Sequence, residues 1–316
     1  MMKSTTGKIL SGALGFMILC LIAAGCGAQK ENTVQGATSE EDGMSAEDQF
    51  STRENENIIQ EEPEQTEQWE GDNVVFAGKS LSILGDSLST FYEWIPEGYG
   101  FFFPFDGEVK DVEQTWWKML QNDLGLVLYG NSSSAGSTCA GDSLSQDDPK
   151  YGCSDYRIAD LTGDGGARPD IIIVYMGTND LLTAVPIGEN DGTEPVEEGM
   201  IETFSDGYCM ILDKLEAQYP SSQVFCCTLA VVGKRNGNIY EAFENRIGLT
   251  YEDYNDQIEL IAGPRGSPLI ELQYCGITLE NMADYVSDGI HFNPEGMKLI
   301  RDEMKNAVID FGADGL

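Results

Sequence analysis

From about residue 74 onward, short apolar runs alternate with stretches whose apolar residues recur at helical spacing. The apolar runs cover residues 81–84, 126–129, 171–176, 224–229 and 269–272. The run 171–176 is the strongest strand prediction, because all six of its residues are apolar, as in a strand buried on both faces. The pattern therefore predicts five buried strands.

Helical spacing lies between and after these runs. It predicts helices over residues 116–124, 200–219 and 251–262, and a last helix from Pro294 to about residue 311. Strands that alternate with helices imply a parallel sheet with helices on both faces. We therefore expect one α/β domain over residues 74–316. Its site should lie beyond the carboxyl ends of the strands.

The first 25 residues have the pattern of an export signal. Lys3 and Lys8 precede a short apolar run, which ends in small residues just before Cys26. Such a run is typical of a signal peptide rather than a membrane span. A Cys directly after Ala-Gly resembles a bacterial lipobox, which implies cleavage before Cys26 and lipid attachment to it. We expect a lipoprotein on the outer face of the bacterial cell membrane; an ordinary signal peptide and an uncleaved anchor remain alternatives.

Residues 26–73 differ in composition from residues 74–316. Glu, Gln, Asn, Ser and Thr dominate, so the segment cannot bury enough apolar surface to offset its ordering entropy. We predict a disordered acidic tether. The whole chain carries a formal net charge of −36, which excludes nucleic acid and anionic membrane surfaces as partners. Membrane association is expected through the lipid anchor alone.

Cysteine and histidine usage bears on disulfides and metals. Of the 8 cysteines, Cys20 leaves with the signal peptide and Cys26 takes lipid. Export permits disulfides, and the sequence leaves open any pairing among Cys139, Cys153, Cys209, Cys226, Cys227 and Cys275. Cys139 and Cys153 share a loop-rich region and are candidates to pair, whereas Cys226 and Cys227 are expected as buried apolar residues. With one histidine and no CxxC spacing, we expect no metal site and no cofactor.

An acidic segment around residues 160–170 raises the question of calcium. Asp160, Asp164 and Asp170 are carboxylates of the kind that calcium prefers. They lack the ordered ligand spacing of a calcium-binding loop. We interpret the segment as an acidic turn.

Four polar segments stand where an active site is expected. Three follow predicted strands: residues 85–89, 130–137 and 177–180; the fourth, 288–292, precedes the last helix. A serine after a strand-ending glycine can occupy a helix N-terminus, where backbone N–H groups and the dipole favour an oxyanion. Ser87 in Gly-Asp-Ser-Leu is such a serine.

A serine nucleophile needs a base and oxyanion donors. His291 is the only histidine, and Asp288 precedes it by three residues in a glycine-containing turn, where it can orient the imidazole. Gly136 offers a backbone N–H and Asn179 a side-chain amide to an oxyanion. Each of these features is common alone. Together, in this order and strand context, they indicate a serine hydrolase.

These four segments resemble the motif blocks of the GDSL/SGNH hydrolase superfamily, and the chain resembles a bacterial secreted lipoprotein member of it. The resemblance implies a Ser87–His291–Asp288 triad and an oxyanion hole made by Ser87, Gly136 and Asn179. It also implies a flavodoxin-like three-layer α/β/α sandwich with a central parallel five-stranded sheet. In the second block, serines occupy positions where the family often has a glycine. We interpret the carboxyls beside the site, Asp86 and Asp180, as framework groups.

The resemblance implies a carboxylic ester hydrolase that works through an acyl-enzyme. We expect its substrate to be a short acyl or acetyl group on a carbohydrate, because the enzyme is expected outside the cell. The alternatives are a lysophospholipase or short-chain lipase, an acyltransferase that uses the same residues, and a catalytically silent glycan-binding lipoprotein. The aromatic-rich segment 91–105 either contacts substrate or packs its own rings over the sheet.

Overall fold

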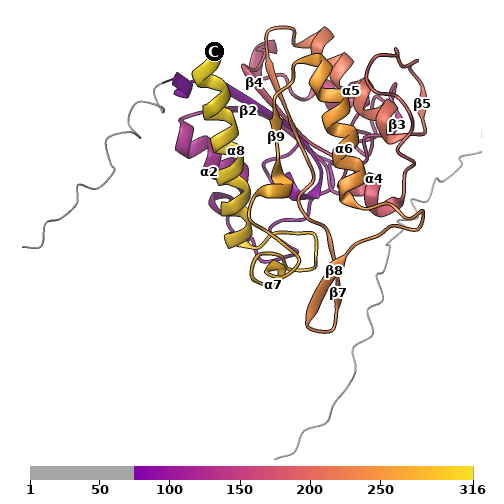
Figure 1. The fold of residues 1–316 in the computed structure, drawn as a ribbon. Helices are drawn as coiled ribbons and strands as arrows, with labels where there is room; N and C mark the ends of the chain where they lie inside the picture. Colours follow the sequence, from indigo (N-terminus) through magenta and orange to yellow (C-terminus); the bar gives the residue numbers. More distant parts are fainter. Residues whose placement is uncertain (1–74, 316) are drawn as a thin grey trace, which may run out of the picture. The chain divides into compact units, whose positions relative to one another are not determined.

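The computed structural model describes residues 75–315, with side chains to residue 312. The predicted signal peptide (1–25) and tether (26–73), with Cys26, lie outside the described residues. A wholly parallel five-stranded sheet forms the centre of the domain (Figure 1). In spatial order, its strands are β2 (Val127–Ser133), β1 (Ser80–Gly85), β4 (Ile171–Tyr175), β6 (Gln223–Cys227) and β9 (Leu269–Ile270).

The strand order reverses at β1. The chain goes from β1 to β2 at one edge and then crosses back to β4, β6 and β9 on the other side. The crevice beyond the carboxyl ends of the strands at such a reversal is where ligands bind in open α/β sheets. Ser87 lies two residues beyond the end of β1. The topology therefore places the Gly-Asp-Ser-Leu segment at the expected position.

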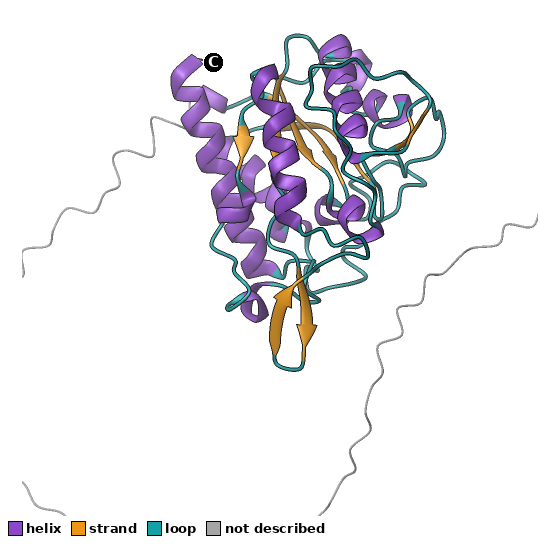
Figure 2. Cartoon of the chain, turned by 45° about the vertical axis from the view of Figure 1, so that its right-hand side comes forward, coloured by secondary structure: helices purple, strands orange, loops and turns teal. Residues whose placement is uncertain are grey.

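Helices cover both faces of the sheet, as Figures 1 and 2 show. One layer holds α2 (Trp116–Leu124) and α8 (Pro294–Gly315), and the other holds α3 (Asp155–Ala159), α5 (Phe204–Gln218) and α6 (Tyr251–Ala262). Alternate residues of β4 enter the two cores: Ile171 and Ile173 pack with the α2–α8 layer, and Ile172 and Val174 with the α5–α6 layer. This confirms the predicted three-layer α/β/α fold.

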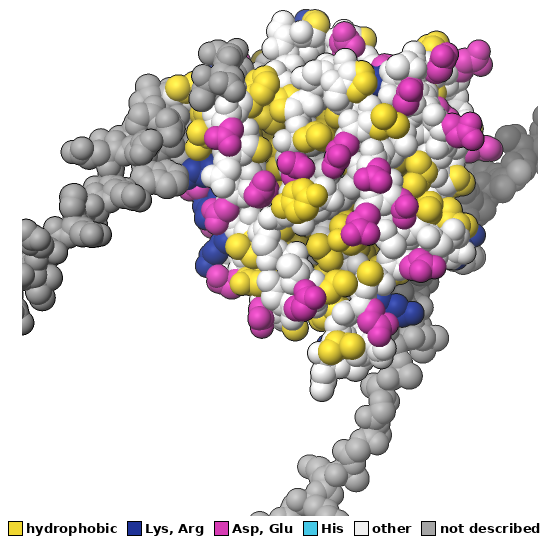
Figure 3. All heavy atoms as spheres, viewed as in Figure 1, with side chains coloured by type: hydrophobic (Ala, Val, Ile, Leu, Met, Phe, Trp, Pro, Cys, Tyr) yellow, Lys and Arg dark blue, Asp and Glu magenta, His cyan; other side chains and the backbone are white. Residues whose placement is uncertain are grey.

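The domain also contains shorter helices and strands outside the central sheet and its main covering helices. They are η1 (Ser87–Ser89), η2 (Val112–Gln114), β3 (Gly141–Asp142), η3 (Asp164–Gly166), α4 (Thr178–Thr183), β5 (Met200–Ile201), β7 (Gly233–Asn236), β8 (Ile239–Ala242), η4 (Gly263–Arg265), η5 (Leu272–Tyr274) and α7 (Met282–Tyr285). The antiparallel β7–β8 hairpin projects from the body of the domain (Figure 2). Figure 3 shows acidic side chains over the whole face viewed, with few Lys and Arg.

The second strand is longer than its apolar run. The prediction ended it at residue 129, whereas β2 continues through Gly130 to Ser133, so the predicted loop 130–137 is half strand. Its polar residues are buried because their hydroxyls find partners: Ser132 Oγ donates to the Arg157 carbonyl at 2.8 Å and Ser133 Oγ to Asn131 Oδ1 at 2.6 Å. An apolar pattern cannot reveal a strand whose burial is offset by hydrogen bonds.

Other helix and strand boundaries also differ from the predicted ones. The helix predicted from residue 200 begins at Phe204, because the side chain of Thr203 caps it by accepting from the Asp206 N–H. Met200–Ile201 instead pairs antiparallel with Gly141–Asp142. The predicted strands 224–229 and 269–272 end at Cys227 and Ile270, and the last helix begins at Pro294 as predicted.

All six cysteines of the described part of the chain are free and buried. The pairing suggested for Cys139 and Cys153 is therefore wrong. Burial raises the pKa of the Cys153 thiol to about 12. Cys226 and Cys227 are buried apolar residues, as predicted.

Two carboxylates of the acidic segment 160–170 accept hydrogen bonds from other parts of the domain. Asp170 Oδ2 accepts from the backbone N–H and the hydroxyl of Ser80, at 2.7 and 2.6 Å. Asp160 accepts from the Tyr99 hydroxyl at 2.5 Å. Within residues 75–315, no helix is long and apolar enough to span a bilayer.

Candidate active site

Ser87 lies in a tight turn at the carboxyl end of β1. Asp86 Oδ1 accepts from the Leu88 N–H at 3.0 Å and so caps the turn η1, in which Ser87 is the first residue. The N–H of a first residue has no acceptor within its own turn. The expected helix N-terminus is only a three-residue turn, so the backbone N–H, and not a helix dipole, is what this position offers to an anion.

Ser87, His291 and Asp288 form one hydrogen-bonded chain. His291 Nε2 lies 2.9 Å from Ser87 Oγ, and His291 Nδ1 lies 2.7 Å from Asp288 Oδ2. A neutral imidazole that donates through Nδ1 to the carboxylate leaves Nε2 free to accept from the serine hydroxyl. The structure thus brings together three residues that are as many as 204 positions apart in sequence.

The Asp288–His291 turn is held from two sides. Asp288 Oδ1 accepts from the backbone N–H groups of Ile290 and His291, at 3.0 and 2.8 Å. Gly289 has φ +95°, and its carbonyl accepts from the Gly233 N–H at 2.9 Å, at the base of the hairpin. A side chain at 289 would collide with the Gly233 carbonyl oxygen. Only glycine therefore fits between the acid and the base.

Asp288 remains ionised at neutral pH. Partial burial opposes its charge, but the hydrogen bonds from the His291 ring and from two backbone N–H groups outweigh that effect and hold its pKa below the usual value. Its side chain is 45% exposed. A charged carboxylate at this position stabilises an imidazolium.

The Asn179 side-chain amide and the Gly136 backbone N–H are among the donors that have no partner within the described residues. Asn179 Nδ2 is buried and unpaired, at the first turn of α4 just beyond β4. Gly136 has φ +78°, which favours glycine, and its N–H makes none of the loop hydrogen bonds. The Gly136 loop is fixed beside the nucleophile strand, because the Ser134 N–H donates to the Gly85 carbonyl at 3.2 Å. Both N–H groups are therefore available to an oxygen of a bound ligand.

Asp86 and Asp180 are fully buried next to these residues. Burial raises the pKa of Asp86 to about 6 and that of Asp180 to about 7. Asp180 accepts from the N–H groups of Cys139 and Ala140, at 2.8 and 3.3 Å, and so ties the loop after β4 to the loop after β2. This geometry matches the interpretation of both carboxyls as framework groups.

Arg157 is a buried residue that sequence reasoning missed. Its side chain is fully buried in α3 and donates to the carbonyls of Gly85 (2.7 Å), Ser132 (2.6 and 3.1 Å) and Pro149 (2.6 Å). Burial lowers its pKa to about 10. Arg157 therefore joins the ends of β1 and β2 directly behind Ser87. In the sequence, it stands in a polar stretch that resembles an exposed helix.

Phe102 also contacts the site. Its ring stacks face to face on the His291 imidazole, with centroids 3.5 Å apart and planes at 7°. The sequence marks segment 91–105 as aromatic but does not indicate which ring faces the base. The segment is divided: Tyr99 and Phe103 are buried, whereas Tyr92, Phe101 and Phe105 are exposed.

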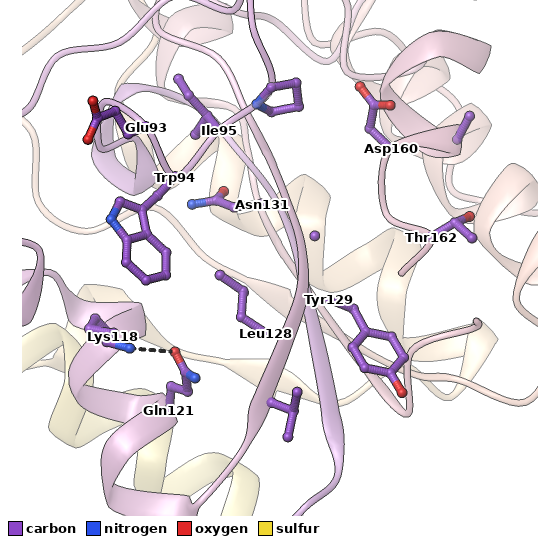
Figure 4. A pocket seen from close by; sticks show the side chains of 14 residues that line it. Glu93, Trp94, Ile95, Lys118, Gln121, Leu128, Tyr129, Asn131, Asp160 and Thr162 are labelled. Atoms are coloured by element: carbon purple, nitrogen blue, oxygen red, sulfur yellow. Dashed lines mark hydrogen bonds between the residues drawn. The ribbon is translucent and has the colours of Figure 1, made fainter. Parts of the chain in front are cut away.

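Two hollows differ in size and in place. A cleft of about 580 Å³ runs along the edge strand β2; Figure 4 shows Trp94 and Tyr129 on opposite sides of it. Neither Ser87 nor His291 lines it. A hollow of about 10 Å³ is lined instead by Leu88, Thr178 and Ile290, each next in sequence to a site residue, with Val231 and Phe292.

The fold and the site define the class of protein: an α/β sandwich with a Ser-His-Asp chain at the carboxyl ends of parallel strands. The family model of the GDSL-like lipase/acylhydrolases matches residues 79–258, more than half of the 316-residue chain. The chain belongs to this family, whose name denotes hydrolysis of acyl esters. No curated protein matches the sequence.

Solved structures agree with the family. A candidate GDSL-like lipase from Bacteroides uniformis is 25% identical, with a TM-score of 0.54 over 73% of this chain and 95% of that one. One from Bacteroides ovatus is 24% identical, with a TM-score of 0.53 over 74% and 99%. A protein from Lactobacillus plantarum is 20% identical, with a TM-score of 0.55 over 74% and 98%. The last two likenesses concern the fold alone.

Proposed function

We propose that this protein is a serine ester hydrolase that removes short acyl groups through an acyl-enzyme on Ser87. The observation that carries the proposal is the chain from Ser87 Oγ through His291 to Asp288, at 2.9 and 2.7 Å; the unpaired amide of Asn179 lies in the first turn of α4, just beyond β4. A hydroxyl with an oriented base and a free donor are what acyl transfer needs.

In the proposed mechanism, His291 Nε2 takes the Ser87 proton while Oγ bonds to the ester carbonyl carbon. The tetrahedral intermediate collapses when the carbon–oxygen bond to the alcohol breaks and His291 returns the proton to that oxygen. Water, deprotonated by the same nitrogen, then bonds to the acyl carbon. The bond from that carbon to Ser87 Oγ breaks, His291 returns the proton to Oγ, and the acid leaves. Asp288 stays ionised throughout and stabilises the imidazolium.

Asn179 is proposed as an oxyanion donor with the N–H groups of Ser87 and Gly136. We expect Asn179→Ala to lower kcat by about 10²- to 10³-fold with little change in KM, because its hydrogen bond strengthens as charge develops on the oxygen. Steady-state kinetics on a chromogenic acetate measure this. Asn122→Ala, the same change at an exposed position on α2, is the control. A loss that appears in KM alone would contradict an oxyanion role.

The packing next to the site residues supports a short acyl group. The hollow lined by Leu88, Thr178 and Ile290, whose lining includes neither Ser87 nor His291, measures about 10 Å³, near the smallest space that admits one water molecule. An acetyl methyl fits such a space, whereas a longer chain has to displace packed side chains such as Val231 and Phe292.

We expect kcat/KM to fall by about tenfold or more from 4-nitrophenyl acetate to the octanoate. The series keeps the leaving group constant, so only the acyl half varies. Rates that rise with chain length would instead favour a lysophospholipase or lipase. Absence of turnover on every ester would favour a silent binding protein.

We further propose, on sequence grounds, that the protein is exported and held at the outer face of the cell membrane by lipid on Cys26. The support is the basic start, the apolar run and the Ala-Gly-Cys sequence at residues 24–26. Cells that express the full chain and are fed an alkyne fatty acid should label the wild type and not Cys26→Ser. Equal labelling, or labelling of neither, would contradict the anchor.

A further inference from the structure

One wall of the site is the short backbone segment around Gly100, which lies between the Gly136 loop and His291. The Gly100 N–H donates to Ser134 Oγ at 3.1 Å, and its carbonyl accepts from the Ala135 N–H at 2.9 Å, next to Gly136. Two residues later, the Phe102 ring covers one face of His291. Phe101 therefore lies between the two ends of the proposed catalytic machinery.

Phe101 belongs to an exposed cluster of three rings, the aromatic rim, formed by Tyr92, Phe101 and Phe105. Its ring centroids are 5.1, 5.4 and 5.3 Å apart, and 45%, 41% and 63% of the respective residues are exposed. Large apolar patches on a protein surface mark binding sites more often than single exposed residues do.

Backbone hydrogen bonds, and not burial, hold the rim in place. The Tyr92 N–H donates to the Phe103 carbonyl, and the Phe102 N–H to Thr90 Oγ1. Thr90 Oγ1 in turn donates to the Ser87 carbonyl at 2.9 Å. The rim is thus fixed to the same turn as the nucleophile, and its rings stay at the surface next to the site.

The chemistry of the site decides which half of an ester meets the rim. His291 must protonate the leaving alcohol, so the alcohol oxygen has to lie against Nε2, beside the ring that Phe102 covers. The acyl oxygen points instead to Asn179 and Gly136. The alcohol half therefore leaves the site on the side of His291, Phe102 and the rim.

The charges around the rim select among alcohols. Glu93, Asp106 and Glu108, which lie within three residues of a rim residue in sequence, are exposed, and Lys110 donates to the carbonyls of Pro104 and Phe105. An acidic surround disfavours a phosphate-bearing alcohol such as a lysolipid headgroup. Neutral rings with apolar C–H faces, as in sugars, fit exposed aromatic side chains.

We propose that the aromatic rim binds the alcohol half of the substrate by stacking, and that this half is a neutral sugar ring. The proposal rests on the proposed ester hydrolysis at Ser87 and names its substrate class: O-acylated neutral glycans.

The test varies the alcohol and keeps the acyl group constant. The substrates are a mono-O-acetylated methyl xylopyranoside and ethyl acetate, with acetate release measured for the full chain. For Phe101→Ala/Phe105→Ala, we expect kcat/KM on the sugar ester to fall by about tenfold, chiefly through KM, because each of the two stacked rings contributes roughly 0.7 kcal/mol. Ethyl acetate, which has no ring, should change by less than about twofold. Tyr274→Ala, an aromatic residue that is 70% exposed and lies outside the rim, is the control and should match the wild type on both substrates.

Phe101→Tyr/Phe105→Tyr should retain the activity on the sugar ester, because the rings remain. Equal losses of the alanine variant on both substrates, or no loss on either, would overturn the proposal. Turnover of ethyl acetate that persists in Ser87→Ala overturns the proposed function itself, which keeps the two failures distinct.

Discussion

Replacing Ser87 with alanine is expected to lower kcat for acetate ester hydrolysis by about 10⁶-fold, leaving only the catalysis that binding and the oxyanion donors supply. The variant removes the atom that forms the acyl-enzyme, while its methyl group fits the space of the hydroxyl. Release of 4-nitrophenol from the acetate by purified protein measures the effect.

Ser89→Ala is the matched control for this variant. Ser89 lies in the same turn, is also buried, and its hydroxyl has no hydrogen-bond partner. We expect it to keep wild-type turnover. A Ser87→Ala enzyme that retains more than about a tenth of wild-type kcat would exclude Ser87 as the nucleophile.

The second large effect concerns Asp288. We expect Asp288→Asn to lower kcat by about 10²- to 10⁴-fold while the fold is retained. If the amide donates to His291 Nδ1, the imidazole proton must move to Nε2, which then cannot accept the Ser87 proton. Asp284→Asn makes the same change of charge at an exposed position nearby and should leave kcat unchanged.

The pH dependence of stability, compared between the wild type and Asp288→Asn, is a second test of the role of Asp288. The pKa of Asp288 is depressed in the folded state, so its hydrogen bonds stabilise the fold above the usual aspartate pKa and are lost only as the pH falls below it. Urea unfolding should therefore show that the stability advantage of the wild type over Asp288→Asn shrinks as the pH falls below about pH 4. An advantage that grows as the pH falls below about pH 4 would contradict a depressed pKa.

The sequence was sufficient to predict most of the fold, because the sheet is buried on both faces. Ile171–Tyr175 is apolar throughout because it packs against two helical layers, so its pattern requires no knowledge of the topology. The predicted end of the second strand was wrong because the buried residues there are polar and make hydrogen bonds. Ser132 and Ser133 are strand residues whose hydroxyls are satisfied within the protein, and only the three-dimensional structure supplies their partners.

The residues of the candidate site likewise differ in how far the sequence can indicate them. Ser87, Asp288 and His291 each lie in a short polar segment next to a predicted strand or helix, and the structure joins them by hydrogen bonds as the sequence predicts. The oxyanion role of Asn179 stays a prediction. Arg157 and Phe102 could not be predicted, since their roles depend on long-range contacts with Gly85 and His291. A buried arginine that binds carbonyl oxygens has no local signature, and one ring among many gives no sign of which partner it stacks on.

Covalent labelling with a fluorophosphonate tests the central claim most directly, because the reagent reacts with a serine that a neighbouring base activates. We predict one adduct per chain, on the peptide that contains Ser87, formed at the rate at which esterase activity is lost. The adduct should be absent from Ser87→Ala and greatly slowed in His291→Ala. Esterase activity that survives complete labelling, or an adduct on another serine that accounts for the loss of activity, would contradict the account.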